Sequence, residues 1–169
     1  MGVFTAPAHT WAILEGLTAA NMNAQLRDFI NGFGACTAYT PAWTATGTAP
    51  VLNNGTLTGS YSQVGKLVFV YGKLLMGSST TYGTGNYSFS LPVASSAGLS
   101  NQNIPLSSVW MRDSSPAADY DGFAFASAST FSVRNAAATF GGNDQVGQTA
   151  PITWASGDWL SWSFWYESS

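Results

Sequence analysis

Hydrophobic and polar residues alternate most densely in residues 53–92, where runs typical of strands are separated by turn residues. A mostly polar run at residues 56–63 is followed by a turn and then by residues 67–76, the longest apolar run of the chain. Residues 82–91 then alternate large side chains with serines. Because a period of two places alternate residues on opposite faces of a strand, these runs predict consecutive antiparallel strands. They are expected to form half of a β-sandwich.

Strand-like runs continue on both sides of this segment and are again separated by Gly, Pro, Asn and Ser. The last two runs, joined by a turn at residues 156–157, predict a C-terminal hairpin. The further predicted strands occupy residues 39–45, 104–112, 120–126, 130–134, 152–154 and 158–167.

The last predicted strand carries large apolar side chains on both faces. Trp159 and Trp165 share one face with two serines. The opposite face carries Leu160, Trp162, Phe164 and Tyr166. Such a strand belongs in the centre of a sheet or at a subunit interface. With about eight strands in all, the chain is predicted to be mainly β, an antiparallel β-sandwich of the jelly-roll-like kind.

One amphipathic helix is predicted at residues 18–33. Thr18 suits its N-cap and Gly34 the left-handed residue that ends it. Two arrangements remain open: the helix packs on its own β-domain, or copies from neighbouring subunits form a bundle. The apolar stripe that would make either contact consists of Met22, Leu26, Phe29, Ile30 and Phe33.

The residues before the helix lack periodicity and are interpreted as an extended arm, in which Trp11 is an attachment residue. Residues 1–38 are therefore expected to form an arm and an attachment or oligomerisation helix. Residues 39–169 are expected to form the β-sandwich domain. Trp159, Trp162 and Trp165 of the last strand are added to the predicted oligomerisation contacts.

Charged residues make up only 8% of the 169-residue chain, whereas about 25% is usual in soluble domains. A weakly charged surface gives little protection against association, which favours an oligomer or a subunit bound to a particle. The five cations are scattered singly, and this pattern excludes a nucleic-acid-binding class. No apolar run reaches membrane-spanning length, and the N-terminus lacks a signal-peptide pattern, so no membrane insertion or secretion by that route is expected.

Few residues offer catalytic chemistry. His9 is the single histidine, and Cys36, the single cysteine, is predicted to be a small packing residue because no cation lies near it in the sequence. Asp113, Asp119 and Asp121 form the one local group of carboxylates; hairpin-turn residues are the leading interpretation, with a structural cation or an acid/base pair as alternatives. No enzyme activity, metal or cofactor is expected.

Aromatic side chains within strands either fill a core or stack on a sugar ring, and without the register these two roles remain open. The candidate glycan contacts are Tyr82, Tyr87, Trp110 and Tyr120.

Several short motifs near the N-terminus form a recognisable set. Residues 10–11, 15–19, 22–23 and 26–28 read TW, EGLTA, MN and LRD. They resemble a motif of the form TW..GE.LTA..MN..LRD found on structural proteins of tailed bacteriophages, especially those of actinobacterial hosts. The order of Glu15 and Gly16 is inverted relative to that form.

A second set of motifs resembles the β-domain of the same virion proteins. These motifs include YTPAW, NGTLTG, VGKLV, TYGTG and SFSLPV, at residues 39–43, 54–59, 64–68, 81–85 and 88–93.

The resemblance covers residues 10–93 and implies a non-enzymatic virion structural protein. It implies a homotrimer, made in the host cytoplasm and bound to other virion proteins, whose arm and helix attach to the particle and whose β-domain projects outward. The leading hypothesis is a short tail-fibre or spike subunit, exposed on the particle, that contributes to host-surface adhesion, with a host cell-surface glycan as a candidate partner because of the aromatic residues. The alternative is a capsid decoration protein or head fibre that stabilises the capsid surface.

Overall fold

A computed structural model gives the fold of the chain. It describes residues 3–4, 16, 18–23, 36–101, 105–136 and 145–169.

The described residues form ten strands and two short helices. The prediction of a mainly β chain is confirmed. In chain order the elements are β1 (Val3–Phe4), α1 (Ala19–Met22), β2 (Thr37–Tyr39), β3 (Trp43–Ala45), β4 (Thr56–Val64), β5 (Leu67–Leu75), β6 (Tyr87–Ser90), α3 (Ala97–Asn101), β7 (Pro105–Asp113), β8 (Ala118–Ala126), β9 (Thr130–Asn135) and β10 (Trp159–Glu167).

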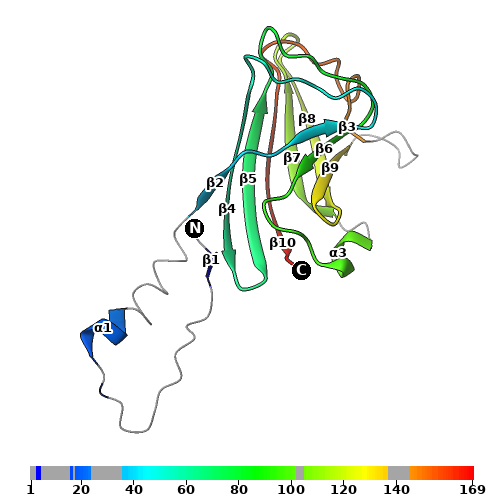
Figure 1. The fold of residues 1–169 in the computed structure, drawn as a ribbon. Helices are drawn as coiled ribbons and strands as arrows, with labels where there is room; N and C mark the ends of the chain where they lie inside the picture. The colour runs from blue at the N-terminus through cyan, green and yellow to red at the C-terminus, as the bar shows by residue number, and fades with distance from the viewer. Residues whose placement is uncertain (1–2, 5–15, 17, 24–35, 102–104, 137–144) are drawn as a thin grey trace.

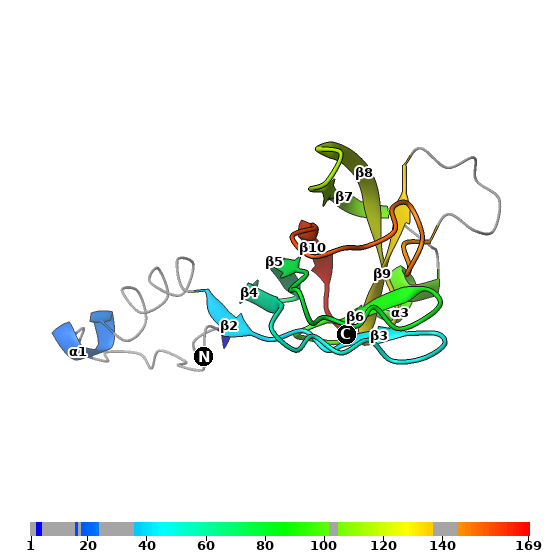
Figure 2. The ribbon, with the colours of Figure 1, turned by 90° about the horizontal axis from the view of Figure 1, so that it is seen from above.

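All ten strands belong to one sheet in the order β1-β4-β5-β10-β7-β8-β9-β6-β3, with β2 also paired to β4. Every pair is antiparallel except β1 with β4. The sheet curls into a half-barrel, visible from above in Figure 2. The predicted jelly-roll sandwich is not confirmed, because the described strands are hydrogen-bonded into one continuous curled sheet.

The predicted strands of residues 53–92 exist, but they are not all neighbours. β4 and β5 form the expected hairpin, whose turn places Gly65 in the left-handed region at φ 59°. β6 instead pairs with β9 and β3. The C-terminal strand β10 lies between β5 and β7, so the central strand of the sheet comes from the end of the chain.

The predicted C-terminal hairpin is wrong. Next to the turn, from Trp159 to Trp162, both edges of β10 are occupied by β5 and β7, so no edge remains there for a strand at residues 152–154. That segment is a loop in which Ile152 and Trp154 are buried, and the Trp154 indole donates a hydrogen bond to the carbonyl of Gly147 at 2.8 Å. The following turn is held by the buried Asp158 carboxylate, which accepts hydrogen bonds from the backbone N–H groups of Ser114 and Ala155.

A single extended segment, residues 37–45, spans the open side of the half-barrel (Figures 1 and 2). Its first part, β2, pairs with β4, and its second part, β3, pairs with β6 at the other end of the sheet. Between them lies the buried Pro41, which has no N–H to donate and suits the point where the chain leaves one strand for another. The next residue, Ala42, continues the pairing through hydrogen bonds with Ser90.

The concave side of the sheet encloses the core. In β10 the predicted alternation is confirmed, because alternate residues are buried from Leu160 to Tyr166. Phe131 of β9 faces them across the core, with ring centroids 5.3 Å from Trp162 and 4.9 Å from Phe164. Burial of a large aromatic ring contributes a few kcal/mol, roughly 1.5–3 each, so this cluster accounts for much of the stability of the curl.

The predicted helix begins where the sequence places it. The Thr18 hydroxyl accepts a hydrogen bond from the backbone N–H of Asn21 at 3.1 Å, which makes Thr18 the N-cap of α1. The predicted continuation to residue 33 lies outside the described residues, as does most of the predicted arm.

Candidate functional site

The convex side of the sheet, called here the outer face, carries bulky apolar side chains that the core does not use. Trp165 is 62% exposed and Trp110 is 52% exposed, although both lie on strands in the middle of the sheet. The exposed large side chains of this face are Leu67, Phe69, Tyr71, Trp110, Phe123 and Trp165. Contiguous apolar surface of this kind marks a contact site more often than a solvated surface.

At one end of the outer face the side chains are mainly apolar; this end is called the apolar half. Trp165 of β10 lies directly opposite Phe69 of β5. Leu67 and Tyr71 flank Phe69 on the same strand, and the rings of Phe69 and Tyr71 are 6.1 Å apart. The apolar half is therefore a continuous surface across two adjacent strands.

At the other end, two indoles lie among charged and hydroxyl groups. The ring centroids of Trp110 in β7 and Trp159 in β10 are 6.4 Å apart, with an angle of 35° between the planes. They are called here the tryptophan pair. The ammonium of Lys73 lies 4.6 Å from the centroid of the Trp159 ring, within cation–π range. Ser161 is directly opposite both Lys73 and Trp110, so a small hydroxyl separates these larger side chains.

One carboxylate organises the polar groups beside the tryptophan pair. Asp119 accepts a hydrogen bond from the Trp110 indole at 3.1 Å and a charge-assisted one from the Arg112 guanidinium at 2.7 Å. These two donors hold the pKa of the Asp119 carboxyl below its ordinary value of 3.8, so it stays ionised near neutral pH. The Asp119 carboxylate therefore joins the indole and the guanidinium on the outer face.

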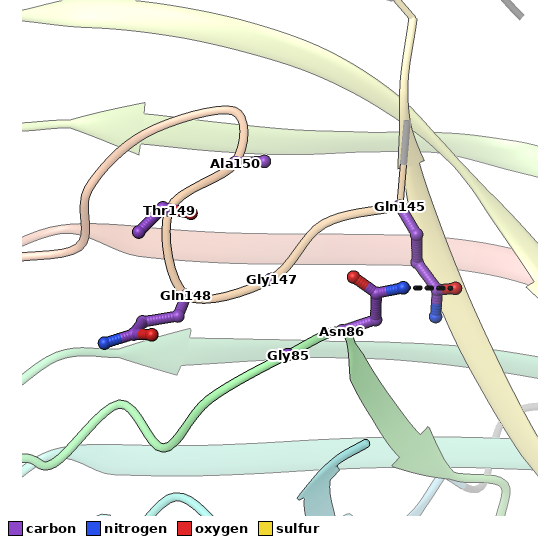
Figure 3. Close-up of a pocket in the computed structure, with 7 residues that line it drawn as sticks. All are labelled: Gly85, Asn86, Gln145, Gly147, Gln148, Thr149 and Ala150. Carbon is purple, nitrogen blue, oxygen red and sulfur yellow. Dashed lines mark hydrogen bonds between the residues drawn. The ribbon is translucent and has the colours of Figure 1, made fainter. Parts of the chain in front are cut away.

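A separate polar pocket of about 260 Å³ lies near the far edge of the sheet, where amide side chains gather (Figure 3). The Asn86 amide donates to the Gln145 side-chain oxygen at 3.4 Å, and the Gln145 amide donates to the carbonyl of Tyr87 at 3.2 Å. Both amides thus serve to join β6 to the loop that follows β9. The pocket is lined by Gly85, Asn86, Gln145, Gly147, Gln148, Thr149 and Ala150.

The four predicted glycan contacts do not lie together. Tyr87 is buried, donates a hydrogen bond to the carbonyl of Tyr82 at 2.8 Å, and belongs to the core. Tyr82 and Tyr120 are half-buried and pack against that core. Trp110 alone of the four lies open on the outer face. The role of these residues in glycan contact stays a prediction. Of the four, Trp110 has the exposed ring that stacking on a sugar requires.

The predicted assembly contacts of β10 divide between the two faces of the sheet. Trp165 lies on the apolar half and Trp159 in the tryptophan pair, whereas Trp162 is buried in the core of its own chain. Met22 falls in α1. The other predicted contacts lie outside the described residues: Trp11, Leu26, Phe29, Ile30 and Phe33.

Of the three carboxylates predicted to cap a hairpin turn, Asp113 lies at the β7–β8 turn, whereas Asp119 and Asp121 lie within strand β8. Asp113 accepts a hydrogen bond from the backbone N–H of Ser115 at 3.1 Å, in the manner of a turn residue. Over the part of the chain that the structure describes, no three His, Cys, Asp or Glu side chains are grouped as a metal site would require. The Cys36 thiol is exposed where the chain enters the sheet edge, so its predicted packing role is not confirmed. His9 lies outside the described residues.

Sequence patterns did not reveal that Lys73, Arg112 and Asp119 surround the tryptophan pair. These residues come from β5, β7 and β8, and only the order and register of the strands place them side by side. The signal available in the sequence was that the last predicted strand carries large aromatic side chains on both faces, which indicates a contact surface on the outer one.

Comparisons with sequence families, with curated proteins and with solved structures found no match for this chain. Among the described residues no helix has the length and apolar character needed to cross a membrane.

Proposed function

We propose that this chain is a non-enzymatic structural subunit of a tailed-bacteriophage particle, a short tail-fibre or spike protein that contributes to adhesion to the host surface. The observation that carries the proposal is the outer face, where exposed aromatic side chains cross the middle of the sheet. Exposed apolar surface of this kind is unfavourable for a free monomer in water, and it suits a protein whose function is to bind another molecular surface.

The two halves of the outer face support two kinds of contact. The apolar half, centred on Trp165 and Phe69, has the composition of a protein–protein interface core, where aromatic residues are enriched and charges are depleted. In the proposal it joins neighbouring subunits, as part of a homotrimer, or other virion proteins. The end with the tryptophan pair faces the host.

The N-terminal segment supplies the attachment in this proposal. An extended arm and a helix over residues 18–33 would anchor the β-domain to the particle, and the Thr18 N-cap supports the start of that helix. The low charge of the chain and the motifs at residues 10–28 support the same role.

The proposal is tested by locating the chain on particles. Cells that express the chain are lysed, particles are purified on a density gradient, and gold-labelled antibodies against residues of β8 and β9 are imaged by electron microscopy. Label at the tail is the expected result. Label on the head would replace the tail-fibre role by the alternative, a capsid decoration protein or head fibre. Absence of label from every particle would overturn both.

A further inference from the structure

The end of the outer face that carries the tryptophan pair combines features that packing alone does not require. Trp110 is 52% exposed, yet its indole N–H is engaged by Asp119, so the ring is held open to solvent in a fixed orientation. Trp159 extends the aromatic surface on the neighbouring strand, with its ring plane tilted by 35°. A fixed aromatic surface of two rings costs little conformational entropy when a flat ligand binds to it.

Hydrogen-bonding groups border the tryptophan pair. Asp119 has lone pairs left after its two observed bonds, and Arg112 has further N–H groups beyond the one at 2.7 Å from the carboxylate. The Ser161 hydroxyl lies between Trp110 and Lys73 in the strand register. Together these side chains offer a hydrogen-bond acceptor, a hydrogen-bond donor and a hydroxyl on neighbouring strands.

A hollow of about 220 Å³ adjoins this surface on β4 and β5. Its rim is formed by the hydroxyls of Thr58 and Ser60 and by the Tyr71 and Lys73 side chains. Lys73 therefore borders both the hollow and the Trp159 ring. The surface continues from the tryptophan pair into this second recess, as a ligand of more than one ring would require.

We propose that this end of the outer face binds a neutral saccharide, with the C–H face of one pyranose ring on the tryptophan pair and its hydroxyls hydrogen-bonded to Asp119 and Arg112. A sugar ring has an apolar face that fits an indole and an edge of hydroxyls that needs both donors and acceptors. The next ring along the saccharide occupies the hollow beside Lys73.

The charges at the site favour a neutral saccharide over an acidic one. Arg112 is already paired with Asp119, and Asp121 lies directly opposite Trp110 in the register. Lys73 is positioned over the Trp159 ring. Because the cations are matched by carboxylates, no surplus positive charge attracts an anionic sugar.

This inference deepens the proposed adhesive function and rests on it for its biological meaning, but saccharide binding itself is measured on the isolated protein. The indole N–H cross-peaks of the seven tryptophans are followed by NMR while methyl glycosides of glucose, galactose, mannose and N-acetylglucosamine are added. The concentration is raised to about 50 mM, because a Kd on the order of 1 mM is expected for ligands of this size.

The expected result is a saturable shift of the Trp110 and Trp159 cross-peaks with at least one neutral glycoside. W110A removes the stacking ring and, separately, D119N removes the charge of a hydrogen-bonding partner; each should weaken binding by about tenfold or more. W165A is the matched control, since Trp165 is an exposed tryptophan on the apolar half, and it should bind as the parent does. Unchanged cross-peaks of the buried Trp154 and Trp162 show that each variant is folded.

Three results of the binding measurements overturn the inference: no glycoside shifts these cross-peaks, W110A binds as the parent does, or sodium glucuronate binds while the neutral glycosides do not. A change of oligomeric state in W110A would assign the tryptophan pair to a subunit contact and also overturns it. If no saccharide binds, the outcome of the particle-labelling experiment is not affected. If the chain binds a saccharide but is absent from particles, the proposed function is wrong and the saccharide site is still supported.

Discussion

Gly59 and Gly72 lie opposite each other in β4 and β5 and give two aromatic rings room to pack on the inner face. A Cβ atom at Gly72 would collide with the Trp162 ring, and one at Gly59 would collide with the Tyr39 ring. The absence of two side chains thus allows Trp162 to be buried and lets β2 lie against β4.

A valine at position 72 should therefore destabilise the fold. G72V forces the Trp162 ring and the backbone of β4 apart, and overpacking of this kind costs about 2 kcal/mol. The free energy of unfolding, measured by urea denaturation, should fall by that amount. The matched control is G98A, where an added methyl group meets nothing within 4 Å; equal stability of the two variants would contradict the packing argument.

Buried tyrosine hydroxyls make stability sensitive to alkaline pH. Burial raises the pKa of the Tyr166 hydroxyl from 10.0 to about 12, and burial also raises the pKa of Tyr39 and of Tyr87. Tyr166 in its neutral form donates to the carbonyl of Val93 at 2.7 Å, a bond that the phenolate cannot make. A group whose folded pKa is raised stabilises the fold fully below its unfolded pKa and loses that effect as pH rises through the folded one.

The chain should therefore keep its stability up to about pH 10 and lose it progressively toward pH 12. Circular dichroism and phenolate absorbance followed in one titration check this, and unfolding should accompany phenolate formation at the buried positions. Ionisation of every tyrosine near pH 10 with the fold intact would contradict it. Y166F should move the alkaline transition to higher pH, because it removes one of the titrating groups.

Single residues could be assigned to a face of the sheet from the sequence only in part. Alternation identified which face of the last strand is buried, because each residue of a strand points to the side opposite its neighbour. It did not distinguish Tyr87, which is in the core, from Trp110, which is open, since both stand in alternating runs. The contact between Trp110 and Asp119 depends on cross-strand register, which local sequence does not encode.

Among the elements, the segment of residues 37–45 has the largest structural role for its length. Its two short strands pair with β4 and with β6, so it covers both edges of the sheet that the curl brings near each other. Uncovered strand edges expose backbone groups and lead to aggregation.

Two truncations test this role. A chain that begins at Thr37 retains both strands and should unfold cooperatively with stability close to that of the full chain. A chain that begins at Thr46 lacks both strands. Its free energy of unfolding should be lower by about 3 kcal/mol or more, or the chain should aggregate. Thermal unfolding followed by light scattering compares them, and equal behaviour of the two chains would show that the segment is dispensable.

Strand existence was predictable, whereas strand order was not. Most predicted strands end within a few residues of the observed ones, because turn residues mark their limits. The position of β10 between β5 and β7 required contacts between residues far apart in the sequence, such as Leu160 with Leu74 and Met111. The hairpin prediction at residues 152–154 failed for the same reason, since it assumed that a neighbour in sequence is a neighbour in the sheet.

At the scale of the whole molecule, the account predicts self-association. The apolar stripe of the predicted helix at residues 18–33 is expected to form the seam of a trimer. L26D and I30D place a charge in that seam and should lower the mass measured by sedimentation equilibrium toward that of one chain. D28N changes a residue that is not part of the predicted apolar stripe and should leave the mass unchanged. A parent protein that sediments as a monomer at micromolar concentration would contradict the trimer.

The proposal that the chain is a structural subunit of a bacteriophage particle can be decided by its copy number in purified particles. Quantitative mass spectrometry of gradient-purified particles, with the major capsid protein as the internal reference, should give a fixed number of copies per particle that is a multiple of three. A copy number that varies between preparations, or a chain that is lost on purification, would contradict the claim.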